Sequence, residues 1–341
     1  MTRQFLASLS MAACVVALES LATAPVAGQA PAAAKATRTP WGHPDLQGTW
    51  DNHTITPLER PARFAGREFL TPQEVAELER RAVLENTDEA RQDGERDVST
   101  AYNDFWWDRA TNVVTSHRTS LIVDPPDGKI PPSVAAARTR QGEVELAYRP
   151  LRATGSFEGG RGADSWTDRS LWERCITQGL PRISTAAYNS NIEIVQSPDD
   201  VVIQYEMIHE SRVVPLDGRP HLDKNVRQYQ GDSRGRWEGN TLVVDTTNFS
   251  DKTNFKGSTS GLHMVERFTR LDPSALKYEI TFDDPTTWTR PWRVETIWRK
   301  SQGQIYEYAC HEGNHGMTGI LAGGREQEKA AGAAAKPGSS K

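Results

Sequence analysis

The chain has 341 residues, of which 37% are hydrophobic and 25% are charged, and its formal net charge is −5. This balance is typical of a folded globular protein, and the small negative charge provides no general attraction to nucleic acid or to an anionic membrane. Ten Trp, eight Tyr and nine Phe are more unusual, because such amphipathic rings either fill a core or line a pocket. We therefore expect no polyanion partner, and we expect most of the aromatic residues to fill the core.

The N-terminus has the order of a signal peptide: Arg3, an apolar stretch over residues 5–18, and small residues up to Ala30. A membrane anchor would need about 20 consecutive apolar residues, and polar side chains interrupt this shorter stretch. Cys14 lies in a sequence that loosely resembles a lipoprotein box, but lipidation there would leave apolar residues exposed behind the anchor. We expect cleavage near Ala30 and a periplasmic or secreted mature chain that is not inserted in a membrane.

The mature chain would keep two of the three cysteines, Cys175 and Cys310. Disulfides persist in an oxidising compartment, so a bridge between these two residues is the simplest interpretation. It would close a loop of about 135 residues, which contributes on the order of 4 to 5 kcal/mol in the chain-entropy model. The alternative, two metal-binding thiolates, lacks a second nearby cysteine to make a CxxC pair.

Composition divides the mature chain into four parts. Residues 31–40 and 325–341 lack apolar periodicity, which predicts a disordered linker after the signal peptide and a disordered tail. Residues 41–170 read as an irregular N-terminal extension that packs on the main domain, and residues 171–324 as that domain.

The N-terminal extension mixes signals for strands and for one helix. Gly48, Thr49 and Trp50 could open a strand, and residues 119–123 read as a short strand before a turn. Thr71, Pro72 and Glu74 supply an N-cap, a proline at the first helical position and a capping-box carboxylate, which predict a helix from Pro72 to about Leu84. The aromatic residues at 105–107 indicate a buried or pocket-lining corner.

Beyond Tyr188 the hydrophobic pattern changes to period two and is bounded repeatedly by turn residues. Short links between strands imply antiparallel pairing, and closure into a barrel would remove exposed edges. We therefore predict a mainly β fold, either an antiparallel, lipocalin-like barrel or a sandwich, with a partly helical N-terminal extension. The expected strands cover residues 191–196, 201–214, 227–229, 241–247, 262–270, 277–282, 292–299 and 305–310.

Strict alternation assigns side chains to the two faces of these strands. It turns His209 inward with Tyr205 and places Arg212 on the opposite face. In the strand at 262–270 it puts Glu266 among inward apolar residues, with His263 opposite. An inward carboxylate is costly unless it is paired or protonated, so Glu266 is either half of a structural ion pair with an arginine or a functional acid or base.

Several histidines lie on or beside the predicted strands. His221, His263 and His311 could supply neutral nitrogens to zinc or another divalent metal, although histidines scattered over strands are more often surface or core residues. No cofactor is required by the sequence, and the identity of any metal stays open.

Two short motifs match catalytic signatures in letters only. Residues 311–315 read HExxH, which binds zinc only on a helix, and the neighbouring glycines and Asn314 indicate a turn. Residues 231–235 read GxSxG, but a nucleophile elbow needs an apolar strand before it and a helix after it. We predict a turn at both positions.

Five longer motifs in the C-terminal half of the sequence resemble those of a known protein family. They are HESR at 209–212, DGRPH at 217–221, GDSRGRWEGNTLVVDTTNF at 231–249, LHMVERF at 262–268 and EYACHEGN at 307–314. Together they resemble an uncharacterised family of exported bacterial proteins, over residues 170–325 and more loosely back to Trp41. The resemblance implies export and carries no activity. Gly48, Thr49 and Trp50 are also similar to the GxW opening of lipocalins.

Three hypotheses follow for function. The first is a barrel that holds a small aromatic or apolar molecule in its interior against Trp288 and the expected ligand-binding residues Tyr205, Arg212, Trp237, Trp292 and Tyr308. The second is a periplasmic hydrolase, lyase or isomerase in which His209, Glu266 and His263 perform acid-base chemistry. The third is an interaction module of the cell envelope, which would need a large exposed apolar patch. The sequence specifies neither the ligand nor the oligomeric state.

Overall fold

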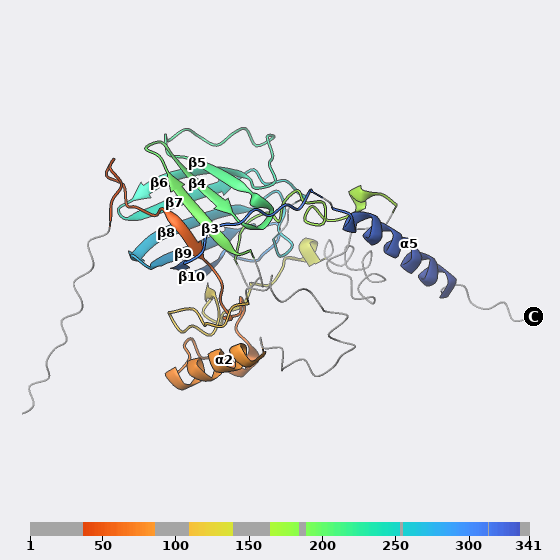
Figure 1. Ribbon diagram of the computed structural model, residues 1–341, viewed down its shortest axis with the longest axis horizontal. Helices are drawn as coiled ribbons and strands as arrows, with labels where there is room; N and C mark the ends of the chain where they lie inside the picture. Colours follow the sequence, from red (N-terminus) through yellow and green to blue (C-terminus); the bar gives the residue numbers. More distant parts are fainter. Residues whose placement is uncertain are drawn as a thin grey trace, which may run out of the picture. The chain divides into compact units, whose positions relative to one another are not determined.

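The computed structural model describes residues 37–85, 109–138, 164–183, 189–252, 255–312 and 314–334. Within this part of the chain ten strands form one antiparallel sheet (Figure 1). Their order is β5-β4-β3-β1-β10-β9-β8-β7-β6, and β2 pairs with β10 off this path. The strands are β1 (Gly48–Asp51), β2 (Ile122–Asp124), β3 (Asn191–Gln196), β4 (Asp200–Tyr205), β5 (Ser211–Pro215), β6 (Asp232–Glu238), β7 (Thr241–Thr247), β8 (His263–Asp272), β9 (Ala275–Asp283) and β10 (Trp292–Lys300).

The two ends of this order, β5 and β6, contact each other, so the sheet is a nearly closed barrel. In the described chain no backbone ladder joins these two strands. Gly235 of β6 packs so tightly that a methyl group on it would lie 2.7 Å from Cδ2 of Leu216 and 2.8 Å from Cγ1 of Val214. Side-chain packing therefore completes the barrel, and the prediction of a mainly β, antiparallel barrel is confirmed.

Aromatic side chains fill much of the barrel interior. Tyr278 packs at 4.8 Å from Phe268 and at 4.4 Å from Trp298, measured between ring centroids. A second group surrounds Trp292, whose ring centroid lies 4.3 Å from that of Phe282 and 5.4 Å from that of Trp288. These rings belong to one continuous hydrophobic core, because alternate residues of β8, β9 and β10 all turn inward.

The N-terminal extension contributes strands to the barrel rather than only packing on it. Strand β1 lies between β3 and β10, and β2 pairs with β10. Trp50 of β1 is fully buried, and its Nε1 donates to the carbonyl oxygen of Leu46 at 2.9 Å. The barrel sheet therefore includes two segments from within residues 41–170, on the N-terminal side of the predicted boundary at residue 171.

Helix α2 (Pro72–Glu85) forms where the capping signals predict it. The backbone N–H of Glu74 donates to the Thr71 hydroxyl at 3.3 Å, and the Glu74 carboxylate accepts from the backbone N–H of Thr71 at 2.9 Å. These two bonds are a capping box. Further helical segments include η1 (Ala62–Phe64), η4 (Trp166–Asp168), η5 (Met207–His209) and α5 (Gly316–Ala334).

The long strand expected at residues 201–214 is wrong, because η5 divides it into β4 and β5. Ile208 and His209 have φ angles of 62° and 44°, so the chain turns through the left-handed region between the two strands. The turn shifts the alternation, and residues beyond it face the opposite way from the prediction. The strands expected at 191–196 and 241–247 are confirmed at both ends, and those at 262–270, 277–282 and 292–299 are confirmed with small differences in their bounds.

Other local predictions also need correction. Residues 227–229 and 305–310 form no strand, and the first of these segments makes only an isolated bridge at Gln228. Residues 231–235 are not a turn, since β6 begins at Asp232 and pairs with β7. Small and charged residues obscured this strand in the sequence, where Gly231 and Gly235 indicated a turn.

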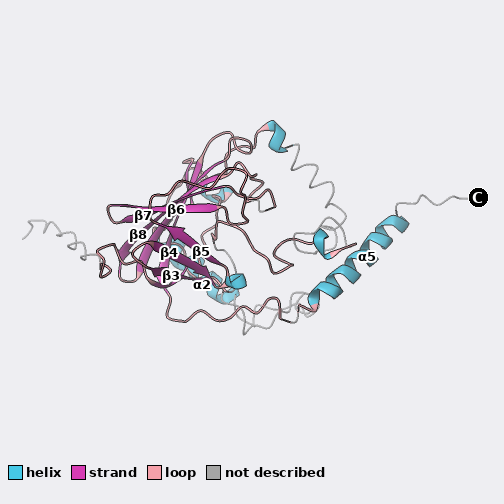
Figure 2. Cartoon of the chain, turned by 90° about the horizontal axis from the view of Figure 1, so that it is seen from above, coloured by secondary structure: helices cyan, strands magenta, loops and turns pink. Residues whose placement is uncertain are grey.

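Two segments predicted to be disordered are ordered where the structure describes them. In the linker, Arg38 donates to Oδ1 of Asn240 at 2.9 Å. At the C-terminus, α5 continues through residues 325–334, because Ala, Glu, Gln and Lys favour helix even without apolar periodicity (Figure 2). The predicted signal peptide and the aromatic corner at 105–107 lie outside the described residues. Among the helices that are described, none has the length and apolarity needed to cross a membrane.

Replacing Gly235 by alanine tests the side-chain packing that closes the barrel. We expect Gly235→Ala to lower the free energy of unfolding by about 1 to 2 kcal/mol, because the added methyl overpacks the contact with Leu216 and Val214. Urea denaturation followed by Trp fluorescence measures the change. The control is Gly303→Ala, where the nearest atom would lie 3.8 Å away. Equal stability of the two variants would contradict this account of closure.

Candidate functional site

A buried ion pair crosses the barrel interior. Glu266 of β8 has no exposed surface, and its carboxylate accepts from Arg212 of β5, Nη1 to Oε2 at 2.5 Å and Nη2 to Oε1 at 3.0 Å. The hydroxyl of Tyr278 donates to the same carboxylate at 2.6 Å. The inward position of Glu266 is confirmed, and its carboxylate forms the ion pair with an arginine that was one of its two predicted roles.

The electrostatics of this cluster follow from burial and mutual compensation. Burial alone would lower the pKa of Arg212, but the Glu266 carboxylate outweighs it and the pKa of the guanidinium is raised. Burial raises the pKa of Tyr205, which lies beside Arg212, and raises that of Tyr278 well above its ordinary value. Both phenols therefore stay neutral, and the cluster holds one positive and one negative charge.

Next to this cluster a small pocket opens at one end of the barrel. It lies where β1 and β4 end and β3 begins, and its volume is about 110 Å³. Apolar atoms come mainly from isoleucine, proline and methionine, and polar atoms from amides, a serine, an arginine and a tyrosine. The lining residues are Asn52, Gln178, Pro181, Arg182, Ile183, Asn189, Ser190, Asn191, Ile192, Tyr205 and Met207.

Two of the residues that line the pocket carry buried polar atoms without a partner. Oδ1 of Asn52 and Nε of Arg182 have no hydrogen-bond partner within the described part of the chain. Asn52 is only 4% exposed, and its amide nitrogen is already engaged with the carbonyl oxygen of Arg182 at 3.2 Å. An unpaired buried polar group costs about 1 to 3 kcal/mol.

Two neighbours hold the side chain of Arg182 in the wall of the pocket. Its guanidinium lies 5.2 Å from the ring centroid of Tyr205 and forms an ion pair with Glu210, just beyond η5. Burial lowers the pKa of Arg182 to about 10, so the side chain stays cationic at neutral pH. The wall of the pocket is thus held by charge pairing on one side and by an aromatic ring on the other.

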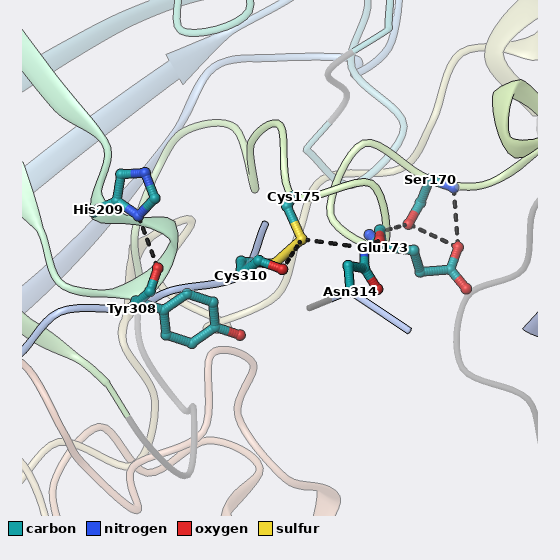
Figure 3. Close-up of a disulfide and its surroundings, with 7 residues drawn as sticks. All are labelled: Ser170, Glu173, Cys175, His209, Tyr308, Cys310 and Asn314. Atoms are coloured by element: carbon teal, nitrogen blue, oxygen red, sulfur yellow. Dashed lines mark hydrogen bonds between the residues drawn. A yellow bond between two sulfur atoms is a disulfide. The ribbon is translucent and has the colours of Figure 1, made fainter. Parts of the chain in front are cut away.

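The predicted disulfide anchors the segment that carries Arg182. Cys175 and Cys310 are joined, with their Cα atoms 5.6 Å apart (Figure 3). Near it, the carbonyl oxygen of Tyr308 lies 2.8 Å from Nδ1 of His209, the last residue of η5. Two contacts therefore fix the 305–312 segment against the parts of the chain that form this end of the barrel.

The residues predicted to bind a ligand are dispersed. Tyr205 lines the pocket, and Arg212 lies behind it in the ion pair. Trp292 is fully buried with Trp288 in the core. Trp237 is stacked at 5.2 Å on His43, and Tyr308 contacts His209 through its backbone. The prediction thus found one lining residue.

The residues predicted to be catalytic do not meet. His209 is exposed, which corrects the inward position expected from alternation, and the cause is the turn at η5. Glu266 is sealed in the core, and Nε2 of His263 lies 3.0 Å from Oδ2 of Asp245 near the surface. Among the described residues, no hydrogen bond joins any two of these three side chains.

The predicted metal ligands come together only in part. His221 and His263 both contact the carboxylate of Asp245, and Nε2 of His221 lies 3.0 Å from its Oδ1. The other ring nitrogen of His221, Nδ1, lies 2.9 Å from Oδ2 of Asp232. His311 follows Cys310 in the disulfide segment, away from this cluster in sequence. In the residues that the structure describes, no group of three or more His, Cys, Asp or Glu side chains has an arrangement that could hold a metal ion. Residues 311–312 and 314–315 are not helical, consistent with the turn expected there.

Asn52 and Arg182 were missed by sequence reasoning. Both lie in segments without hydrophobic periodicity, so the alternation of apolar residues could not show which way their side chains point. The one available signal was position, because Asn52 directly follows the strand that Trp50 predicts. A polar residue at the end of a barrel strand is placed to line the opening.

These features define a β-barrel protein with a small, partly polar pocket at one end. No family model matches the chain, and no curated protein matches it. Among solved structures, the chain is similar to a crystal structure of a mutant of the fluorescent protein UnaG, with 13% sequence identity and a TM-score of 0.23. The similarity covers 39% of this chain and 86% of that one. These values support no assignment of function.

Replacing Glu266 by glutamine tests the buried ion pair. We expect Glu266→Gln to lower the free energy of unfolding by about 3 to 5 kcal/mol, because it leaves the Arg212 charge buried without a counter-ion. Guanidinium chloride denaturation provides the measurement. The double variant Arg212→Met with Glu266→Leu should lose less, since neither charge remains. A double variant less stable than the single one would overturn this interpretation.

The contact between His263 and Asp245 predicts a pH-dependent stability. The hydrogen bond with Asp245 raises the pKa of His263 above its ordinary value of about 6.5. Burial would raise the pKa of Asp245, but the interactions with His263 and His221 outweigh burial and lower it. The contribution of His263 is therefore complete below about pH 6.5 and is lost as pH rises through its folded-state pKa. The contribution of Asp245 is lost as pH falls through its own lowered pKa.

The corresponding variant is His263→Gln. We expect it to cost about 0.5 kcal/mol at pH 5.5, because the pair is half exposed, and less at pH 8.5. Urea midpoints at the two pH values measure the difference. The matched control is His315→Gln, an exposed histidine with no ion pair among the described residues. A cost for His263→Gln that is the same at both pH values would count against the assignment.

Proposed function

We propose that this protein is an exported β-barrel that binds a small organic molecule in the pocket between Asn52, Arg182 and Tyr205. The observation that carries the proposal is the pair of unpartnered buried atoms, Asn52 Oδ1 and Arg182 Nε, on residues that line the pocket. Buried polar groups are nearly always satisfied in native proteins, and those that are not call for an explanation. A bound ligand supplies one.

The size of the pocket limits the ligand to about one ring. An apolar cavity of about 150 Å³ is enough to bind benzene, and this pocket has about 110 Å³ and an open side. Ile183, Ile192 and Met207 offer apolar contact, which suits an aromatic body. A phenol hydroxyl or a primary amide could donate to Asn52 and accept from Arg182. We therefore propose a single-ring aromatic molecule that carries such a group.

The binding site proposed here lies at the end of the barrel rather than in its middle. The tryptophans expected to form an interior wall, Trp288 and Trp292, pack against each other and against Phe282. The centre also holds the compensated pair of Arg212 and Glu266. Tyr205 connects the two regions, because it lines the pocket and lies beside Arg212.

Export is supported by two independent features. The N-terminal 30 residues have the order of a signal peptide, and the disulfide between Cys175 and Cys310 suits an oxidising compartment. The resemblance of the 209–212, 217–221, 231–249, 262–268 and 307–314 motifs to an exported bacterial family agrees with both. We do not extend the proposal to catalysis, because His209, Glu266 and His263 lie in three separate environments.

The test uses the chain expressed with its own N-terminus in a bacterial host. Export predicts that the intact mass of the purified protein corresponds to loss of about 30 residues, and an unprocessed mass would contradict it. The purified protein is then titrated calorimetrically with phenol, benzamide and benzene. We expect phenol or benzamide to bind more tightly than benzene, because only these two can pair with Asn52 and Arg182.

The decisive variant is Asn52→Leu, which keeps the volume and removes the unpaired acceptor. We expect at least a tenfold weaker affinity, equivalent to about 1.4 kcal/mol. Asn240→Leu makes the same change at the opposite end of the barrel and should bind as the wild type. Ile183→Phe, which fills the pocket while keeping Asn52, should also abolish binding. Unchanged affinity in both pocket variants would refute the site.

A further inference from the structure

A second hollow lies beside the pocket at the same end of the barrel. It is an open groove with a volume of about 580 Å³, within the range of about 300 to 1,000 Å³ that is usual for ligand sites. Four segments line it: residues 176–177, the start of β5 at 210–211, the 227–230 stretch before β6, and the chain just after β7 at 250 and 252. Arg182, which lines the pocket, forms an ion pair with Glu210, which lines this groove.

The charges around the groove are unbalanced. Its one acidic side chain, Glu210, is already paired with Arg182 and accepts from Nε2 of Gln230 at 2.8 Å. Its two cations, Arg227 and Lys252, form no ion pair with any residue in the described part of the chain. Within the described residues, the groove thus presents two positive charges without a counter-ion.

One of these cations is held in place by the backbone. Nη1 of Arg227 donates to the carbonyl oxygens of Phe249, at 3.2 Å, and Ser260, at 2.5 Å. These bonds fix the planar guanidinium at the groove while using only one of its three nitrogens. A pre-positioned arginine loses little side-chain entropy when it binds a carboxylate, and its fork geometry suits that group.

We propose that this groove is a second binding site, for a small organic carboxylate, that acts independently of the pocket. Arg227 and Lys252 pair with the carboxylate. The apolar body of the molecule lies along Ile176 and the ring of Tyr229, which is 37% exposed. Because both cations are exposed, salt screens the attraction and weakens binding.

The probe is 4-phenylbutyrate, and 4-phenylbutanamide is its uncharged counterpart. In calorimetric titration at low ionic strength, we expect the carboxylate to bind at least tenfold more tightly than the amide, and to weaken severalfold in 0.5 M NaCl. The variant Arg227→Gln with Lys252→Gln should weaken 4-phenylbutyrate at least tenfold. Arg63→Gln with Lys129→Gln makes the same change in net charge on exposed residues elsewhere and should bind as the wild type.

Three results would overturn the proposal: equal loss in the two double variants, equal affinity for carboxylate and amide, or no measurable binding of 4-phenylbutyrate to the wild type. The single variant Lys252→Gln keeps the hydrogen bonds from Arg227 to the backbone. Weaker binding of 4-phenylbutyrate by this variant would therefore come from the lost charge and not from a disturbed loop. Asn52→Leu should leave 4-phenylbutyrate affinity unchanged. If Asn52→Leu abolishes binding and the groove variant does not, the carboxylate occupies the pocket and the groove proposal fails.

Discussion

The ion pair between Arg212 and Glu266 is the interaction on which the rest of the structure depends. It links β5 to β8 across the interior, and β5 is a strand that no backbone ladder joins to β6 in the described chain. A lone charge at either position would be too costly to bury, so the two residues must face inward together. The left-handed turn at η5 makes this possible, because it rotates β5 relative to β4 and brings Arg212 inside.

The same turn creates the end of the barrel where both proposed sites lie. It directs Met207 toward the pocket and His209 toward the carbonyl of Tyr308, and it is followed by Glu210, which lines the groove. One local departure from strand geometry therefore serves three purposes: it compensates a buried charge, shapes a cavity and provides a contact for the disulfide segment.

Sequence reasoning succeeded where one periodic signal was sufficient. Period two correctly placed Glu266 inside and located β3, β7, β8, β9 and β10. Cysteine counting correctly paired Cys175 with Cys310. It failed where two residues far apart in the chain had to be known together. Arg212 was assigned to the wrong face because the apolar pattern does not indicate a turn at Ile208. Asn52 and Arg182 were missed because they belong to segments whose positions are defined only in the folded barrel.

The disulfide between Cys175 and Cys310 lies outside the strands of the barrel. The last strand, β10, ends at Lys300, so the ten strands of the described sheet all precede Cys310 in the chain. The barrel also needs pairing between distant segments, since β1 pairs with β3 and with β10. The segment that carries Arg182 gains its anchor only when Cys175 and Cys310 lose two electrons to an oxidant. The state of this end of the barrel therefore depends on the redox conditions in which the chain folds.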